Sequence, residues 1–291
     1  MTTLLFCVGA TKAGTSWLHR FLSDHPQCHL RAIKELHYFD ALDFGGAEGQ
    51  LKRLARERER FEGQMPTAQG PRVLNLARQV ADRLEWASVI ARGREDRSAY
   101  LAYLTGGQGA GQQLVADMTP AYGLLSTERL KAMAGLLPDV RFVYLLRDPV
   151  ERLWSHVRML AGRNSPDGAA DAETAADLLD GTIAGREEGI AKRSDYRAAI
   201  EKLRRAVDPK RLCIMFYEEM VSGDGMRRLC AFLGLDFVAP DTARRIHVSP
   251  PLQMTPAQRR AARDWLAPQY DYVRAEIGAL PPAWRTEYQK V

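Results

Sequence analysis

The 291-residue chain is poor in cysteine and has no long apolar run. Its four cysteines are too few and too widely spaced for a disulfide framework, and they form no C-x-x-C pair for zinc. No apolar stretch approaches the roughly 20 residues that a helix needs to cross a bilayer. The N-terminus shows no basic region followed by a cleavage site. We therefore expect a soluble, cytoplasmic protein with no stable membrane insertion.

A dense basic block is also missing. Lys and Arg number 41 against 36 Asp and Glu, which gives a net charge of +5 with neutral His. Scattered arginines without an RNA-binding aromatic motif are not typical of a nucleic-acid-binding protein, so we expect no nucleic-acid partner. The mild positive charge suits a small anionic ligand. Composition is close to that of ordinary globular proteins, with 46% apolar and 26% charged residues.

Short apolar segments alternate with helical patterns along the chain. Residues 4–8 form a continuous apolar run bounded by glycine, which is typical of a buried parallel strand. Further strands are predicted at 114–116, 141–146 and 212–216, with helices near 15–24, 126–137, 149–161, 196–207, 218–233 and 255–278. Strands that alternate with helices predict an α/β fold with a parallel sheet covered on both faces.

Two segments depart from this alternation. Residues 41–113 are rich in Arg, Glu, Gln and Gly and predict a helical insertion. Residues 162–193 begin with a polar, glycine-rich stretch and predict a flexible excursion or lid. Because no internal repeat or convincing linker is present, we expect a single domain over residues 1–291.

The stretch FCVGATKAGTSW joins the first predicted strand to the first helix. A nucleotide-hydrolysing P-loop reads G-x-x-x-x-G-K-[ST], with its lysine directly after the second glycine. Gly9 and Gly14 keep this spacing, but Thr15 takes the lysine position and the lysine, Lys12, lies inside the loop. Such a loop directs backbone N–H groups at one point, where Lys12, Thr15 and Ser16 would also bind an anion. A tight turn without a ligand is the alternative.

A second stretch, RFVYLLRDPVERLWSHVRML, begins in another predicted strand. Arg147 ends that strand, Asp148 is placed to cap the next helix, and Pro149 suits its first turn. Ser155 lies about two turns into the helix, where its hydroxyl and the arginine would reach one phosphate. The alternative is that Arg147 pairs with a nearby acid.

Together these stretches resemble the sulfotransferases that use 3′-phosphoadenosine 5′-phosphosulfate (PAPS). TKAGTSWL is similar to the P-K-x-G-T-[ST]-W-L loop of that family, with Thr11 in place of the proline. The resemblance implies a P-loop-NTPase-like three-layer fold with a central parallel sheet flanked by helices. It also implies a 3′-phosphate site at Arg147 and Ser155. The implied contacts to the rest of the nucleotide are Lys12, Ala13, Gly14, Thr15, Ser16, Trp17 and, from IMFYEEM, Tyr217.

The stretch KELHYFD carries three groups suited to acid–base chemistry, Glu35, His37 and Asp40. It resembles the E-V-H-F-F-D stretch of heparan-sulfate-type carbohydrate sulfotransferases, whose glutamate is the catalytic base. In-line sulfuryl transfer needs such a base and cations on the moving group. The resemblance implies Glu35 as base, helped by His37 and Lys12. His37 as base, or simple ion pairing at a strand end, are the alternatives.

One departure from the carbohydrate enzymes concerns their K-T-P-A-Y-F stretch. This chain has Met118 where they have an active-site lysine, and Lys34, Lys192 or Arg193 would have to substitute. The implied reaction moves a sulfuryl group from PAPS, without a metal, to a hydroxyl or amine of a small molecule, lipid or carbohydrate. The missing anchor suggests a bacterial relative. The sequence leaves the oligomeric state open.

Two other functions fit part of the pattern. A P-loop kinase would use Mg²⁺ and ATP, with a strand-end acid such as Asp117 supporting the metal. The displaced lysine argues against it. A non-catalytic nucleotide-binding module would keep the loop, but it would not need Glu35.

Overall fold

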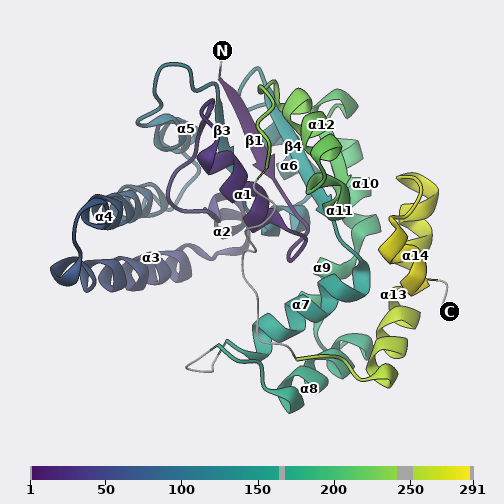
Figure 1. The fold of residues 1–291 in the computed structure, drawn as a ribbon. Coiled ribbons are helices and arrows are strands. Elements are labelled where there is room, and N and C mark those ends of the chain that lie inside the picture. The colour runs from purple at the N-terminus through teal and green to yellow at the C-terminus, as the bar shows by residue number, and fades with distance from the viewer. Residues whose placement is uncertain (1, 164–167, 241–251, 289–291) are drawn as a thin grey trace.

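A five-stranded parallel sheet forms the centre of the molecule (Figure 1). The computed structural model describes residues 2–163, 168–240 and 252–288. The strand order is β2-β3-β1-β4-β5, so the first strand of the chain lies in the middle. The strands are β1 (Thr3–Cys7), β2 (Cys28–His29), β3 (Leu114–Asp117), β4 (Val140–Leu146) and β5 (Leu212–Phe216). The predicted α/β fold with a parallel sheet is confirmed.

The central strand is buried on both faces. Leu4 pairs with Val115 on one side and with Val140 on the other. The side chains of β1 from Leu4 to Cys7 have no exposed surface, which explains why the strand is a continuous apolar run rather than an alternating one. Burial of this strand fixes the position of the loop that follows it.

Helices cover the sheet and build the parts beyond it (Figure 1). Before β3 these are α1 (Thr15–Asp24), α2 (Tyr38–Phe44), α3 (Ala47–Glu62), the 3₁₀ turn η1 (Met65–Thr67), α4 (Pro71–Ile90) and α5 (Arg97–Thr105). Between β3 and β5 they are η2 (Pro120–Leu124), α6 (Thr127–Ala134), α7 (Pro149–Ala161), α8 (Ala172–Ile183), α9 (Glu188–Ser194), α10 (Tyr196–Ala206) and η3 (Pro209–Arg211). After β5 follow α11 (Tyr217–Met220), α12 (Gly223–Leu233), α13 (Pro256–Glu276) and α14 (Pro282–Tyr288).

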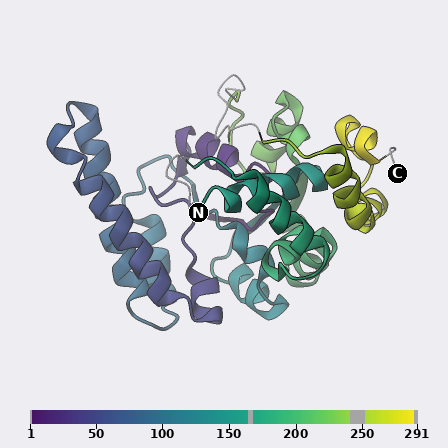
Figure 2. The ribbon, with the colours of Figure 1, turned by 90° about the horizontal axis from the view of Figure 1, so that it is seen from below.

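The helices α3 and α4 form a hairpin that projects from one side of the sheet in both views (Figures 1 and 2). Arg83 of α4 pairs with Glu57 of α3 at 2.9 Å. At the base of the hairpin Trp86 is fully buried and its Nε1 donates to the Leu36 carbonyl at 3.0 Å. The segment predicted as a helical insertion therefore supports the chain just before α2.

Two predicted segments differ from what the structure shows. The range 162–193, expected as a polar excursion, contains α8 and α9, apart from residues 164–167, which lie outside the described residues. Leu179 and Ile190 of these helices are buried, and both helices pack on α7. The single helix predicted at 218–233 is two helices, because Ser222 caps a new one by accepting from the N–H of Gly225 at 3.1 Å.

The last two helices pack against the ends of β4 and β5. Trp284 of α14 has no exposed surface and meets the ring of Phe216 edge-on, with centroids 5.0 Å apart. Tyr270 of α13 donates to Asp148 Oδ2 at 2.8 Å, so α13 reaches the residue that caps α7. None of the described helices is long and apolar enough to cross a membrane.

Candidate active site

The loop between β1 and α1 ends at the N-terminus of α1, where an anion has room to bind. Gly14 adopts φ 90°, a left-handed conformation that favours glycine, and it supplies no side-chain cap to α1. A Cβ at this position would overlap the ring of Tyr217, which packs directly against the loop. The N-terminus of α1 carries positive charge from the helix dipole and free N–H groups, so the geometry favours a phosphate or sulfate there.

Ala13 differs from the other loop residues that were predicted to contact the nucleotide. Its side chain is fully buried, and its backbone N–H donates to the carbonyl of Ala10 at 3.0 Å. The N–H is therefore used inside the loop. Ala13 does not line the cavity beside the loop, whereas Lys12, Gly14, Thr15, Ser16 and Trp17 do.

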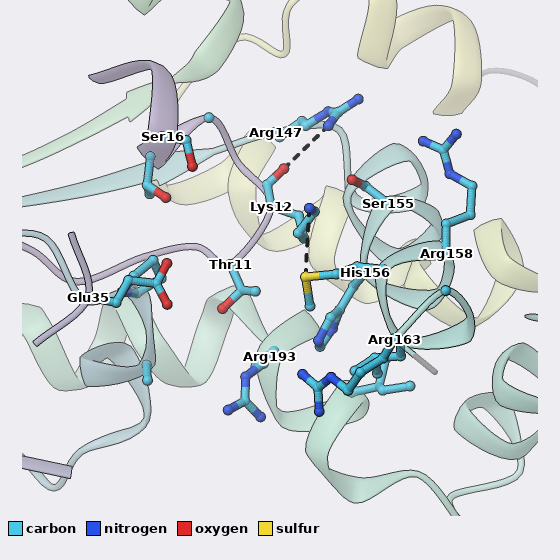
Figure 3. A pocket seen from close by; sticks show the side chains of 18 of the residues that line it. Thr11, Lys12, Ser16, Glu35, Arg147, Ser155, His156, Arg158, Arg163 and Arg193 are labelled. Atoms are coloured by element: carbon cyan, nitrogen blue, oxygen red, sulfur yellow. Dashed lines mark hydrogen bonds between the residues drawn. The ribbon is translucent and has the colours of Figure 1, made fainter. Parts of the chain in front are cut away.

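A cavity of about 1200 Å³ opens where the loop meets the carboxyl ends of the strands. Ligands bind at this edge in open parallel sheets. The cavity brings together residues from distant parts of the chain (Figure 3). Of the predicted site residues beyond the loop, it is lined by Glu35, His37, Arg147, Ser155 and Tyr217.

Arg147 lies at the end of β4, next to the loop. Its Nη1 donates to the carbonyl of Lys12 at 3.3 Å, and its own carbonyl accepts from the Tyr196 hydroxyl at 2.6 Å. No carboxylate within the described ranges forms an ion pair with Arg147. Within the described residues, the alternative in which Arg147 pairs with an acid therefore has no support. Its guanidinium remains available to an anion, together with Ser155.

Asp148 and Pro149 begin α7 as the sequence predicts. The Asp148 carboxylate accepts from the N–H of Glu151 at 3.0 Å, and Pro149 occupies the first turn. Burial raises the pKa of Asp148 to about 6, although this hydrogen bond and that from Tyr270 act in the opposite direction. The cap holds Arg147 and Ser155 in a fixed relation.

Lys12 carries its charge into the cavity. Its Nζ lies 3.8 Å from the sulfur of Met159, which is a weak acceptor, and no carboxylate of the described residues pairs with it. Burial lowers the pKa of Lys12, and the charges of Arg147 and Lys34 lower it further. An anion in the cavity would relieve this repulsion.

Glu35, His37 and Asp40 form a chain of interacting groups. His37 Nε2 lies 3.5 Å from Glu35 Oε2, and His37 Nδ1 lies 2.6 Å from Asp40 Oδ2. Burial alone would raise the pKa of Glu35, but the hydrogen bond from His37 and the charge of Lys34 outweigh it and lower the pKa to about 2. Burial likewise opposes the charge on His37, yet Asp40 and Glu35 raise its pKa to about 9. At neutral pH the pair is therefore Glu35 carboxylate and His37 imidazolium.

Lys34 connects this chain of groups to the loop. Its Nζ donates to Glu35 Oε1 at 2.8 Å and to Thr15 Oγ1 at 3.3 Å. Among the three cations considered as substitutes for the lysine missing at Met118, Lys34 and Arg193 line the cavity. Lys192 points elsewhere, since its exposed Nζ pairs with Glu188 at 2.7 Å.

Asp117, the last residue of β3, positions the segment that carries Glu35 and His37 through intervening hydrogen bonds. Asp117 is fully buried, and burial raises its pKa to about 6 despite three hydrogen bonds. Two of its donors in turn hold the segment, because they accept from the N–H groups of Leu36 and Tyr38 at 3.0 and 2.9 Å. The donors to Asp117 are Thr119 at 2.6 Å, Tyr122 at 2.8 Å and Tyr100 at 2.9 Å. The strand-end acid considered for magnesium thus positions this segment.

Several cavity residues were not predicted. Arg158 and Met159 follow Ser155 at helical spacing on α7, a signal in the sequence that would have found them. Arg163 and Arg193 reach the cavity only through the tertiary arrangement of α7 and α9. His156 also lines it, and burial, followed by the charges of nearby arginines, lowers its pKa to about 3, so it is neutral.

A parallel sheet, an uncapped helix after a glycine loop and a cationic cavity define a P-loop-like α/β protein whose cavity suits an anion. The sequence profile of the sulfotransferase family matches residues 5–239. The chain belongs to the sulfotransferase family, and its reaction is sulfuryl transfer.

Solved structures agree with this fold. The chain is similar to the sulfotransferase from Alicyclobacillus acidocaldarius, with 23% identity, a TM-score of 0.65, and coverage of 98% of this chain and 99% of that one. It is also similar to the sulfotransferase domain from the curacin biosynthetic pathway, with 18% identity, a TM-score of 0.51, and coverage of 82% and 76%. No curated protein sequence matches the chain significantly. Within the described ranges, no cluster of His, Cys, Asp or Glu is suited to a metal ion.

Proposed function

We propose that the chain transfers the sulfuryl group of PAPS to a hydroxyl or amine acceptor. The observation that carries the choice of donor is the position of Arg147, beside Ser155 and the loop and without a carboxylate partner in the described ranges. A 3′-phosphate on the nucleotide would satisfy this charge. ATP, which lacks that phosphate, would not.

The 5′-phosphosulfate would lie at the N-terminus of α1. Gly14, Thr15 and Ser16 offer backbone and hydroxyl donors there, and Lys12 places a point charge in the cavity. As the S–O bond to the phosphate breaks, negative charge grows on the bridging oxygen. These groups stabilise that charge because they are already oriented toward it.

Glu35 would accept the proton of the acceptor as its oxygen or nitrogen attacks the sulfur. The carboxylate is ionised, lines the cavity, and is oriented by Lys34 and His37. The imidazolium of His37 is already protonated at neutral pH, so it is not free to take a proton. Its role is to hold Glu35 in place. In-line attack places acceptor and leaving phosphate on opposite sides of the sulfur.

Thermal-shift titration with 3′-phosphoadenosine 5′-phosphate (PAP) tests the donor. A ligand that binds only the folded protein raises the melting temperature by mass action, by roughly 2.7 kcal/mol of stability at 100 times Kd. We expect a clear rise with PAP, a smaller one with ADP, and at least a tenfold weaker PAP affinity in Arg147→Ala.

Arg141→Ala is the matched control, because Arg141 lies on β4, which Arg147 directly follows, and pairs with Asp139 away from the cavity. Equal stabilisation by PAP and ADP would refute recognition of the 3′-phosphate. A preference for magnesium-ATP would instead favour a kinase-like use of the same loop.

A further inference from the structure

Two arginines face the cavity at the end away from Arg147. Arg163 follows the last turn of α7, and Arg193 lies on α9 (Figure 3). In the close view they lie near each other, while Arg147, Ser155 and Arg158 occupy the opposite part of the cavity (Figure 3). Arg193 is half-buried and Arg163 is exposed. Like charges brought close together are unfavourable unless a negative group joins them, most of all where one of them is partly buried.

The surroundings of Arg193 place this pair on the acceptor side. Burial lowers the pKa of Arg193, the charge of Arg163 lowers it further, and Asp40 and Glu35 act in the opposite direction. Its guanidinium donates to the carbonyl of Gly189 at 2.8 Å. No ion pair joins Arg163 or Arg193 to a carboxylate in the part of the chain that the structure describes.

The pair lies in another part of the cavity than Arg147 and Ser155, the residues proposed to bind the 3′-phosphate (Figure 3). Ser155 lies six residues before the end of α7 at Ala161, which corresponds to about 9 Å at 1.5 Å per residue. Arg163 lies beyond that end. The two groups of cations therefore suit two separate anions, with Lys12 and the loop between them (Figure 3).

We propose that Arg163 and Arg193 bind an anionic group carried by the acceptor, a carboxylate, sulfate or phosphate. This inference rests on the proposed function, because it assumes that the nucleotide fills the Arg147 side. A guanidinium suits such groups, since its planar donors match two oxygens at once. The acceptor is then a molecule with a nucleophilic hydroxyl or amine near Glu35 and a negative charge at its far end.

Calorimetric titration of the PAP-saturated protein at fixed ionic strength tests this binding. The probes are 4-hydroxybenzoate and 4-hydroxybenzenesulfonate, with neutral 4-hydroxybenzamide as their isostere and inorganic sulfate as the smallest anion. We expect each anion to bind at least tenfold more tightly than the amide. Arg163→Gln and Arg193→Gln should each remove this preference, whereas Lys192→Gln, an exposed neighbour paired with Glu188, should keep it.

PAP affinity, measured first in every protein, separates the two proposals. Failure of the wild type to bind PAP would overturn the proposed function and this inference with it. Normal PAP binding with no anion preference, or a preference that survives both arginine variants, would overturn only the acceptor site. If Arg193→Gln lowered kcat equally for charged and neutral acceptors while anion binding persisted, Arg193 would contact the moving sulfuryl group instead, and the proposal would be wrong.

Discussion

Glu35 and His37 hold opposite charges over most of the accessible pH range. Glu35 is ionised above about pH 2, and His37 is protonated below about pH 9. A carboxylate with so low a pKa is unprotonated at neutral pH, but it is a weak base. Its contribution therefore depends on position, which Lys34, His37 and the buried Asp117 provide through the hydrogen bonds described above.

Replacing Glu35 by Gln tests its role as base. The amide keeps the shape but accepts no proton, so we expect kcat to fall by roughly 10²- to 10⁴-fold. PAP affinity should stay within about threefold, because Glu35 belongs to the acceptor side. Steady-state kinetics and PAP titration measure both. Glu187→Gln is the control, since Glu187 also lines the cavity. Wild-type kcat in Glu35→Gln would show that another group takes the proton.

The pH dependence of the reaction separates Glu35 from His37 as base. With Glu35 as base, kcat/KM for an aliphatic alcohol acceptor at saturating donor should be flat from about pH 7 to 8, because the charges of Glu35 and His37 are constant there and Asp117 and Asp148, with pKa values of about 6, are ionised. A change should appear near pH 9, where His37 loses its proton. With His37 as base, the rate would instead rise about tenfold per pH unit up to that point. Initial-rate assays across this pH range decide between Glu35 and His37 as the base.

At the scale of elements, the contact between the loop and Tyr217, the first residue of α11, depends on one missing Cβ. Gly14→Ala would force a side chain into the Tyr217 ring and into a left-handed backbone conformation. Gly45 provides the control, because it has φ 72° at the end of α2 but nothing within 4 Å of an added Cβ.

We expect Gly45→Ala to lower the free energy of unfolding by about 1 kcal/mol, the cost of the backbone conformation alone. Gly14→Ala should lower it further and weaken PAP binding at least tenfold, because the loop must shift. Urea denaturation and PAP titration measure these effects. Equal effects of the two substitutions on both quantities would mean that the Tyr217 contact contributes nothing.

The elements differ in how well the sequence predicts them. The bounds of α1 and α7 are correct, since a glycine loop, an Asp cap and a first-turn proline are local signals. The helices α8 and α9 were not predicted, because their burial comes from tertiary packing: both pack on α7, and α8 also packs on α13, which lies far along the chain. A local motif predicted Arg147 as a candidate site residue, and it lines the cavity, whereas no local signal indicated that Arg163 would also line it.

At the scale of the whole molecule, the C-terminal helices link the ends of two strands. Trp284 packs between Phe216 and Tyr270, and its Nε1 donates to Glu218 Oε1 at 2.9 Å. Tyr270 in turn binds Asp148, the cap of α7. The helices α13 and α14 thus support the side of the cavity that Arg147 lines.

Trp284→Ala should lower the free energy of unfolding by about 3–5 kcal/mol, through lost burial and an empty space in the core. Trp265→Ala, at a half-buried position on α13, is expected to have a smaller effect. Guanidinium denaturation of both variants measures the difference. A loss below about 1 kcal/mol for Trp284→Ala would mean that α14 does not depend on this contact.

The ammonium group of Lys34 donates hydrogen bonds both to Glu35, the proposed base, and to the hydroxyl of Thr15 in the loop proposed to bind the donor. When an anionic donor occupies the loop, part of the attraction that Lys34 exerts on Glu35 is redirected to the donor, and the carboxylate becomes more basic. The enzyme is therefore best able to activate an acceptor after its donor is in place. The pKa of Glu35 should therefore be higher in the PAP-bound protein than in the ligand-free one, which NMR titration of the carboxylate measures.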